Sequence, residues 1–457
     1  MNRPTRRELR LNTFQMAAPS HNWAGLWRHP RDNQVDYNRL TYWTEMARTA
    51  ERGLLDGIFI ADVFGIYDVY GGNADAALTA AAQAPQADPT LAISAMALVT
   101  EHIGFGVTAS LTHDHPFAFA RRFTTLDHLT GGRLGWNIVT GYLESGARGL
   151  GLQSLRGHDE RYDAAEDYVT ALYKLWEGSW EDGAAVRDKA AGVFAQASRV
   201  HPVVHDGPYY QVNGRALAEP SPQRTPVLYQ AGTSARGRVF AGRHAEASFI
   251  NGQTPAIAAK AVRALRESAR AAGRDPHDVL ALLGATVIVA PTTAQAHDLR
   301  DEYRRYIDAA GQLALVSGWT GIDLSKLAPD DVLPFAKSNA VQSTLENLTV
   351  NATQPTRVRD LLDFSPAGAR APVFVGSPVD VADQIEQWVA ATDIDGFNLV
   401  RTVMPESLDA IVDLLVPELQ SRGLFKTRYP EGTLREKLFP AGTARLPSRH
   451  PGAAFRR

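Results

Sequence analysis

The sequence predicts an α/β protein folded as a (β/α)8 TIM barrel, because short apolar runs alternate with longer amphipathic segments. Eight such runs occur, which is the number of strands that closes this kind of barrel. The 457 residues exceed an ordinary single domain, but barrels that carry insertions reach this length. We therefore expect one domain over residues 1–457.

Each expected strand is a run rich in Val, Ile, Leu or Phe, as the buried strands of parallel sheets are. Residues 37–52 and 162–176 repeat apolar side chains at the helical period and predict helices between the strands. In chain order the expected strands span residues 9–16, 56–63, 103–111, 133–141, 226–232, 247–252, 282–290 and 396–402.

Three regions depart from this repeat. Residues from about 177 to 224 and from about 311 to 371 do not fit it, and we expect them to be insertions between barrel elements. From about residue 417 the chain is turn-rich, and we expect a C-terminal extension that wraps the surface or a neighbouring subunit.

Composition limits the possible functions. The formal net charge of −3 gives no electrostatic reason to expect nucleic acid or a membrane as a partner. The start "MNRPTRRELR" lacks the apolar core of a signal peptide, so we expect a cytoplasmic location. The sequence has no cysteine, which excludes thiolate nucleophiles and cysteine-ligated clusters. Redox chemistry would therefore need a bound cofactor.

One residue in the stretch "GRLGWNIVTGY" is unusual for a buried strand. Asn137 lies in its middle, and a buried carboxamide without a partner costs on the order of a few kcal/mol. Side-chain alternation directs Asp62, Thr108 and Asn137 toward the mouth at the carboxyl ends of the strands, where barrel enzymes bind their ligands. The alternative is that each is a satisfied polar group at a strand end.

Two helix starts carry groups that bind anions. His158 and Tyr162 are four residues apart on one helix face, and together they suit a phosphate or a ring edge. The segment "QAGTSARG" is a turn before a helix, where backbone N–H groups and the Ser234 hydroxyl suit a single phosphate. The alternatives are a packing pair for the first and a simple helix N-cap for the second.

The loop after the first strand, "SHNWAGLWRHP", is rich in aromatic residues. With Phe14 before it, and with His21 and Trp23 within it, this loop suits closure over an apolar substrate or a flat ring. The alternative is a hydrophobic loop packed on the barrel rim. His113 and His115 in "LTHDHPF" raise a metal site as a further alternative, without a clear third ligand.

Several of these motifs together resemble one enzyme family. The segments "FIADV", "GFGVTAS", "ARRFTTLDHLTGGRLGWNIVTGY", "HDERYDAAEDY", "LYQAGTSARG" and "SHNWAGLWRHP" are similar to the bacterial luciferase superfamily. They resemble its group of monooxygenases for nitrilotriacetate, dibenzothiophene sulfone and long-chain alkanes. Further segments, among them "SRVHPVVHDGPYYQVNG", are most similar to the branch that oxidises dimethyl sulfide.

The resemblance implies a flavin-dependent monooxygenase. It implies that reduced FMN comes from a separate NAD(P)H:flavin reductase, reacts with O2 and delivers one oxygen atom to a small organic substrate. Asn137 would then pair with the edge of the flavin ring, and Asp62 and Thr108 would lie near it. His158, Tyr162 and Ser234 would hold the FMN phosphate.

The resemblance also directs the remaining assignments. We expect His21 to be the catalytic residue beside the activated oxygen, with Phe14, Trp23 and Tyr67 as substrate-binding walls and no metal ion. We expect a homo-oligomer, a dimer or a tetramer. Two other classes stay open: a metal-dependent barrel hydrolase that uses His113, His115 and Asp62, and a flavin-binding protein without catalytic activity.

Overall fold

Eight parallel strands close into a barrel in the computed structural model, which describes residues 8–232, 234–335, 340–352, 354–362, 364, 370–440 and 442–457. The (β/α)8 barrel expected from the sequence is confirmed. Each of the eight predicted runs contains or overlaps a barrel strand. In chain order these are β1 (Arg10–Met16), β2 (Gly57–Ala61), β3 (Gly104–Ser110), β4 (Leu134–Val139), β7 (Val227–Gln230), β8 (Ala247–Ile250), β9 (Leu280–Val289) and β11 (Gly396–Val400).

The barrel closes because β9 pairs with both β8 and β11, while β11 pairs with β1. The first and last barrel strands are joined in register from Arg10 opposite Gly396 to Phe14 opposite Val400. A buried side-chain hydrogen bond, from Asn12 Nδ2 to Asn398 Oδ1 at 2.8 Å, marks this seam. A ninth parallel strand, β10 (Val373–Gly376), lies outside the barrel beside β9, and the sequence did not predict it.

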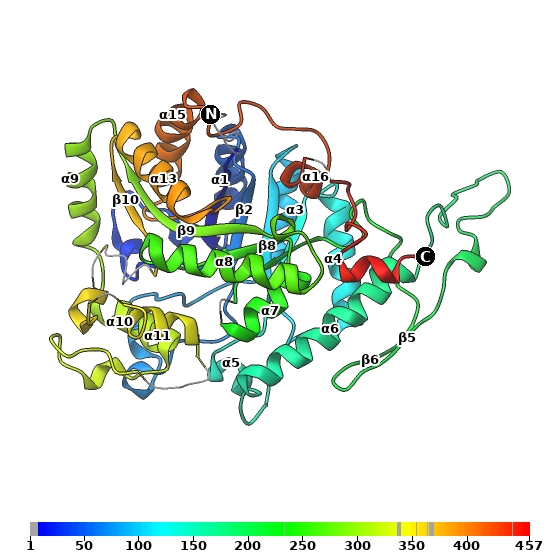
Figure 1. The fold of residues 1–457 in the computed structure, drawn as a ribbon, viewed down its shortest axis with the longest axis horizontal. Coiled ribbons are helices and arrows are strands. Elements are labelled where there is room, and N and C mark those ends of the chain that lie inside the picture. The colour runs from blue at the N-terminus through cyan, green and yellow to red at the C-terminus, as the bar shows by residue number, and fades with distance from the viewer. Residues whose placement is uncertain are drawn as a thin grey trace.

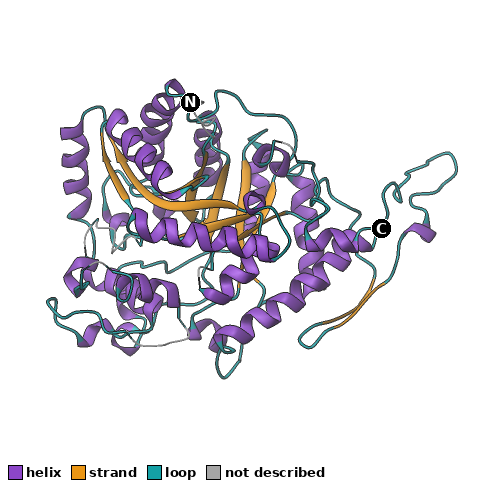
Figure 2. Cartoon of the chain, in the orientation of Figure 1, coloured by secondary structure: helices purple, strands orange, loops and turns teal. Residues whose placement is uncertain are grey.

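Helices surround the strands, as Figures 1 and 2 show. The expected helices are present as α1 (Leu40–Arg52) and α6 (His158–Gly178). The others are α2 (Asp75–Thr79), α3 (Thr90–Leu98), α4 (Pro116–Leu129), α5 (Glu144–Gly149), α7 (Ala235–His244), α8 (Pro255–Ala271), α9 (Thr293–Arg304), α10 (Ala309–Thr320), α11 (Gln342–Leu348), α13 (Pro378–Thr392), α14 (Glu406–Ala410), α15 (Val416–Ser421) and α16 (Leu434–Leu438).

Helices α10 and α11 lie at the carboxyl-terminal end of the barrel, below the strands in Figure 1. They pack through Leu315, Trp319 and Leu348 against Tyr67 in the loop after β2. The backbone of Ala24, in the loop after β1, donates to Gln312 Oε1 at 3.3 Å. This segment therefore covers the loops that border the mouth of the barrel.

A two-stranded antiparallel hairpin, β5 (Val203–Asp206) and β6 (Gln211–Gly214), belongs to an arm that extends away from the barrel (Figure 1). The arm is fixed to α6 by Asp167, whose carboxylate pairs with His205 at 2.9 Å and accepts from two backbone N–H groups of the hairpin turn.

Among the helices of the described chain, none is both long and apolar enough to span a bilayer.

Candidate active site

One cavity lies at the carboxyl ends of β2, β3, β4 and β7, the end at which barrel enzymes bind their ligands. The six residues expected to hold the cofactor come together on its wall, along with Phe14. They are Asp62, Thr108, Asn137, His158, Tyr162 and Ser234. The structure therefore gathers side chains from four strand ends and two helix starts around one space.

An aromatic layer forms the inner end of this cavity. The ring of Phe14 lies 5.4 Å from that of Phe59 and 5.0 Å from that of Phe249, and Phe59 lies 5.4 Å from Tyr229. Gly135 makes room for this layer, because a Cβ there would lie 2.4 Å from Cε2 of Tyr229. The layer closes the barrel interior with apolar rings below the polar strand ends.

One of the two polar atoms of the Asn137 side chain has a hydrogen-bond partner in the described chain. Its Nδ2 donates to Thr108 Oγ1 at 2.8 Å, whereas its Oδ1 is buried with no hydrogen-bond partner in the described chain. The Oε1 atom of Gln230, on the same cavity, is also buried and unpaired there. Two unpaired acceptors bordering a cavity suit the N–H groups of a bound heterocycle.

Asp62 is a half-buried acid at the junction of two cavities. Its Oδ1 accepts from Gln86 Nε2 at 3.1 Å. Burial, and then the nearby charge of Asp88, raise the pKa of Asp62 to about 7. Asp62 and Thr108 also line a second cavity of about 790 Å³. Near neutral pH the Asp62 carboxyl is therefore partly protonated and able to donate a hydrogen bond.

The groups expected to bind a phosphate lie together at the start of α7. The Tyr162 phenol hydrogen-bonds with the side chains of Ser234 and Gln230, and its ring centroid lies 5.4 Å from that of His158. Ser234 is also the N-cap of α7, accepting from the backbone N–H of Gly237 at 3.1 Å. The helix-cap alternative is therefore realised, and the Ser234 hydroxyl still has a proton to donate.

Gly232 permits this close arrangement. A Cβ at Gly232 would lie 2.2 Å from the Tyr162 hydroxyl and 2.3 Å from Gln230 Nε2. Non-bonded heavy atoms do not approach each other this closely, so a side chain here would displace both polar groups. The chain needs glycine at this position to bring its backbone against the site.

His21 is buried directly behind the cavity wall. Its ring packs edge-on against Phe14 at 4.4 Å, and it hydrogen-bonds with the Phe14 backbone. Burial, followed by the charges of Arg401 and Arg370, holds the pKa of His21 well below its ordinary value. The imidazole is therefore neutral at pH 7. Its Nδ1 has no partner in the described chain and is an acceptor, not a source of protons.

Tyr67 and Trp23 do not themselves border this cavity. The Tyr67 hydroxyl bonds to Gln83 Oε1 at 2.7 Å and to the hydroxyl of Tyr142 at 2.5 Å, and Tyr142 does line the cavity. Trp23 packs instead against Phe364, with ring centroids 4.4 Å apart. Tyr67 is thus separated from the cavity by Tyr142. Trp23 belongs to a separate apolar cluster.

The histidine pair is used in other ways. His115 is the N-cap of α4 through Nδ1, and its Nε2 lies 3.0 Å from the Gln211 carbonyl oxygen. The His113 ring packs at a tilt of 35° against Phe64, with ring centroids 3.6 Å apart. Among the residues that the structure describes, no group of three or more His, Cys, Asp or Glu side chains is arranged to hold a metal ion.

Sequence reasoning missed Arg370, which borders the same cavity. Its guanidinium lies over the Trp319 ring, 4.0 Å from the ring centre, and its backbone has a φ of 58°. Nothing in the sequence "SPAGARAPV" distinguishes this arginine from an exposed loop residue. A half-buried cation in a left-handed backbone conformation is evident only from the fold.

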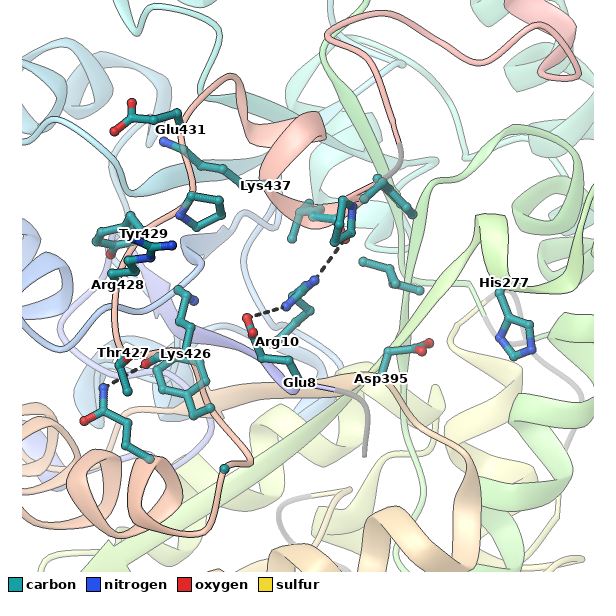
Figure 3. Close-up of a pocket in the computed structure, with 18 residues that line it drawn as sticks. Glu8, Arg10, His277, Asp395, Lys426, Thr427, Arg428, Tyr429, Glu431 and Lys437 are labelled. Carbon is teal, nitrogen blue, oxygen red and sulfur yellow. Dashed lines mark hydrogen bonds and ion pairs between the residues drawn. The ribbon is translucent and has the colours of Figure 1, made fainter. Parts of the chain in front are cut away.

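A further cavity, of about 1010 Å³, lies at the opposite end of the barrel (Figure 3). It is bordered by Arg10 at the start of β1 and by the chain between α15 and α16. Its central cations already have partners: Arg10 pairs with Glu8 at 3.0 Å, Lys426 pairs with Asp56 at 2.9 Å, and Lys437 donates to the His102 carbonyl oxygen at 2.8 Å. The contacts of Lys426 and Lys437 fasten the C-terminal segment to the amino-terminal end of the barrel.

Comparison with known proteins agrees with this arrangement. A family model described as luciferase-like monooxygenase matches residues 13–394. The chain is 48% identical to the dimethyl-sulfide monooxygenase of Hyphomicrobium sulfonivorans, over 98% of this chain and 93% of that one. It is 43% identical to the long-chain alkane monooxygenase of Geobacillus thermodenitrificans (strain NG80-2), over 98% of both.

A solved structure is also similar. The crystal structure of riboflavin lyase, with modified FMN and the substrate riboflavin, superposes with a TM-score of 0.92 at 34% identity. The match covers 99% of this chain and all of that one.

Proposed function

We propose that this chain, which belongs to the luciferase-like monooxygenase family, is the oxygenase half of a two-component system. Such a flavin-dependent monooxygenase would use reduced FMN as a co-substrate. The observation that carries the proposal is that one cavity has a phosphate-type site at one side and unpaired amide oxygens beside an aromatic layer. A flavin mononucleotide needs both, a phosphate site and acceptors for its ring N–H groups.

The residues divide by role. His158, Tyr162 and Ser234 would hold the phosphate at the start of α7, where the helix dipole also favours an anion. Asn137, with Thr108 fixing its amide, and Asp62 would hold the ring. When bound, reduced FMN supplies the electrons that activate O2, so that one oxygen atom enters the substrate and the other leaves as water.

The chain's own part is to position the ring and exclude water. Phe14, Phe59 and Phe249 form an apolar wall that keeps solvent from the reacting region. His21 is neutral, and its Nδ1 has no partner among the described residues, so it would accept a hydrogen bond from the reacting oxygen. Phe14 would contact the substrate, and Tyr67 would support the wall from behind through its hydrogen bond to Tyr142.

A small apolar organosulfur compound such as dimethyl sulfide is the substrate we propose. The aromatic wall and the similarity to a dimethyl-sulfide monooxygenase support it. Oxidation of one methyl group would release methanethiol and formaldehyde. A separate NAD(P)H:flavin reductase would supply the reduced flavin, as expected for a two-component enzyme.

A homo-oligomer is part of the proposal. The arm that holds β5 and β6 exposes Phe194, Val204 and Leu217, each more than 60% accessible. Apolar side chains on an arm without its own core suit packing against a second copy. Sedimentation of the intact chain and of a Phe194→Ser/Val204→Ser double variant tests this, because only the variant should dissociate.

Titration with FMN under anaerobic and aerobic conditions tests the cofactor. Reduced FMN should bind more tightly than oxidised FMN, because the enzyme must capture it before it reacts with O2 in solution. A panel of sulfides, sulfones, alkanes and aminopolycarboxylates, assayed with FMN, NADH and a flavin reductase, tests the substrate. Equal affinity for both flavin states, with no O2-dependent product, would contradict the proposal.

A further inference from the structure

Arg370 carries a half-buried guanidinium for which the described residues provide no counter-charge. Its side chain borders the flavin cavity, and its Nε is buried with no hydrogen-bond partner in the described chain. The same part of the chain provides no carboxylate within ion-pair distance of this guanidinium. Burial lowers the pKa of Arg370, which shows that its surroundings disfavour the charge that it carries.

The acidic and phenolic groups around Arg370 do not neutralise it. Tyr142 and Tyr67 are the titratable groups that act electrostatically on Arg370, and burial raises the pKa of both phenols, so they stay uncharged. His21 is neutral as well. Asp62, which shares the cavity wall, is partly protonated near neutral pH. An arginine does not give up its proton under these conditions, so its charge has no partner among the residues that the structure describes.

The fold nevertheless holds this side chain in a fixed place. Trp319 supports the guanidinium face at 4.0 Å, and Trp319 is itself fixed by its indole N–H, which donates to the Tyr67 hydroxyl at 3.2 Å. The backbone of Arg370 adopts a φ of 58°, which costs energy for a residue other than glycine. A strained, stacked and unpaired guanidinium at a cavity wall is prepared for an anion that arrives with a ligand.

We propose that Arg370 binds the anionic edge of the ligand in this cavity, a planar group whose negative charge is spread over neighbouring oxygen or nitrogen atoms. The inference rests on the proposed function. Two sources share this chemistry: the pyrimidine edge of anionic reduced flavin, and a carboxylate on the substrate. The phosphate is not the partner, because its site is formed by His158, Tyr162 and Ser234.

Three variants test the inference by binding alone. Arg370→Met removes the charge and keeps most of the side-chain length, and Arg370→Lys keeps the charge without the planar fork. Arg401→Met is the matched control, since Arg401 is also an arginine that acts electrostatically on His21. Arg401 already donates to Ala18 O, Tyr42 and Gln15, and it does not border the cavity. Circular dichroism and thermal melting report whether each variant folds.

Two titrations distinguish the sources. In the first, Kd is measured for oxidised and for reduced FMN under anaerobic conditions. If reduced flavin is the anion, Arg370→Met should lower the preference for reduced FMN roughly ten- to hundredfold. Arg370→Lys should retain part of it, and Arg401→Met should leave it unchanged.

In the second titration, (methylthio)acetate and dimethyl sulfide are added to enzyme loaded with oxidised FMN, and the flavin absorbance is followed. If a substrate carboxylate is the anion, Arg370→Met should lose affinity for (methylthio)acetate by a similar factor and keep its affinity for dimethyl sulfide. Either result supports the inference and names the source.

The inference is overturned if folded Arg370→Met matches the wild type in both titrations, because Arg370 would then only pack on Trp319. It is also overturned if Arg401→Met has the same effect as Arg370→Met, because the effect would then be a general field and not contact. Failure of the wild type to bind FMN at all would refute the proposed function itself, and the two failures are therefore distinct.

Discussion

The Ser234 hydroxyl has two tasks that a single substitution separates. Its oxygen accepts from the Gly237 N–H and caps α7, and its proton is left to donate to Tyr162 or to a bound phosphate. In Ser234→Ala, loss of the cap should cost about 1 kcal/mol of folding stability. Loss of a hydrogen bond to a charged phosphate should cost about 1.5–3 kcal/mol of binding, which is roughly ten- to a hundredfold in FMN affinity.

Thr254→Ala is the matched control for the cap. Thr254 is the N-cap of α8 in the next β/α unit, accepting from Ile257 N at 3.3 Å, and it does not border the cavity. Both variants should melt slightly earlier than the wild type, but only Ser234→Ala should lose affinity for FMN. Isothermal titration with FMN and with riboflavin, which lacks the phosphate, measures this.

Riboflavin affinity should be the same in wild type and Ser234→Ala. If the variant still prefers FMN to riboflavin as strongly as the wild type does, Ser234 is a helix cap alone. A loss of FMN affinity in Thr254→Ala as large as that in Ser234→Ala would refute the reasoning in another way, because the effect would then follow from general destabilisation.

Three further predictions concern the same cavity. His21→Ala should still bind reduced FMN and consume O2 but release more hydrogen peroxide per NADH; unchanged product yield, measured with peroxide in one assay, would remove His21 from the catalytic residues. Gly232→Ala should weaken FMN binding at least tenfold, because its Cβ would displace Tyr162 and Gln230; fluorescence titration measures this, and wild-type affinity would contradict it. The raised pKa of Asp62 means that the folded state holds a proton that the unfolded state releases, so this carboxyl makes stability fall as pH rises from about 4 to about 7. The free energy of unfolding of Asp62→Asn, relative to that of the wild type, should therefore be higher at pH 8 than at pH 4. Denaturant unfolding at both pH values measures this, and the same difference between variant and wild type at both would contradict the reasoning.

The barrel could be read from the sequence because its strands are buried on both sides. Strand β9, for example, has ten consecutive buried residues, and such a run looks the same in sequence and in structure. The extra strand β10 is four residues long with alternate residues half-buried, which leaves too little pattern to identify. The hairpin strands β5 and β6 are equally short.

The candidate site was partly predictable for a related reason. Thr108 and Asn137 follow from strand alternation, because the direction of a side chain in a strand is fixed by parity. Alternation does not explain Asp62, which lies just after β2, because Ile58 and Ile60 of the same parity pack in the outer core while Phe59 faces the barrel interior. Loops have no such rule. The aromatic loop after β1 therefore gave no means of knowing that Trp23 turns toward Phe364 while His21 turns toward Phe14. Arg370 was missed because its burial depends on contacts with α10, far away in the sequence.

The seam between β1 and β11 has a consequence for how the protein is made. Strand β1 is synthesised first, but one of its two neighbours is formed by residues almost at the other end of the chain. The ribosome must therefore deliver nearly the whole polypeptide before the ring of strands is complete, and contacts between such distant residues form slowly. Until then the edge of β1 along Arg10–Phe14 is open to pairing with other chains. We expect a nascent chain that stops before residue 396 to bind no flavin and to depend on chaperones for its solubility.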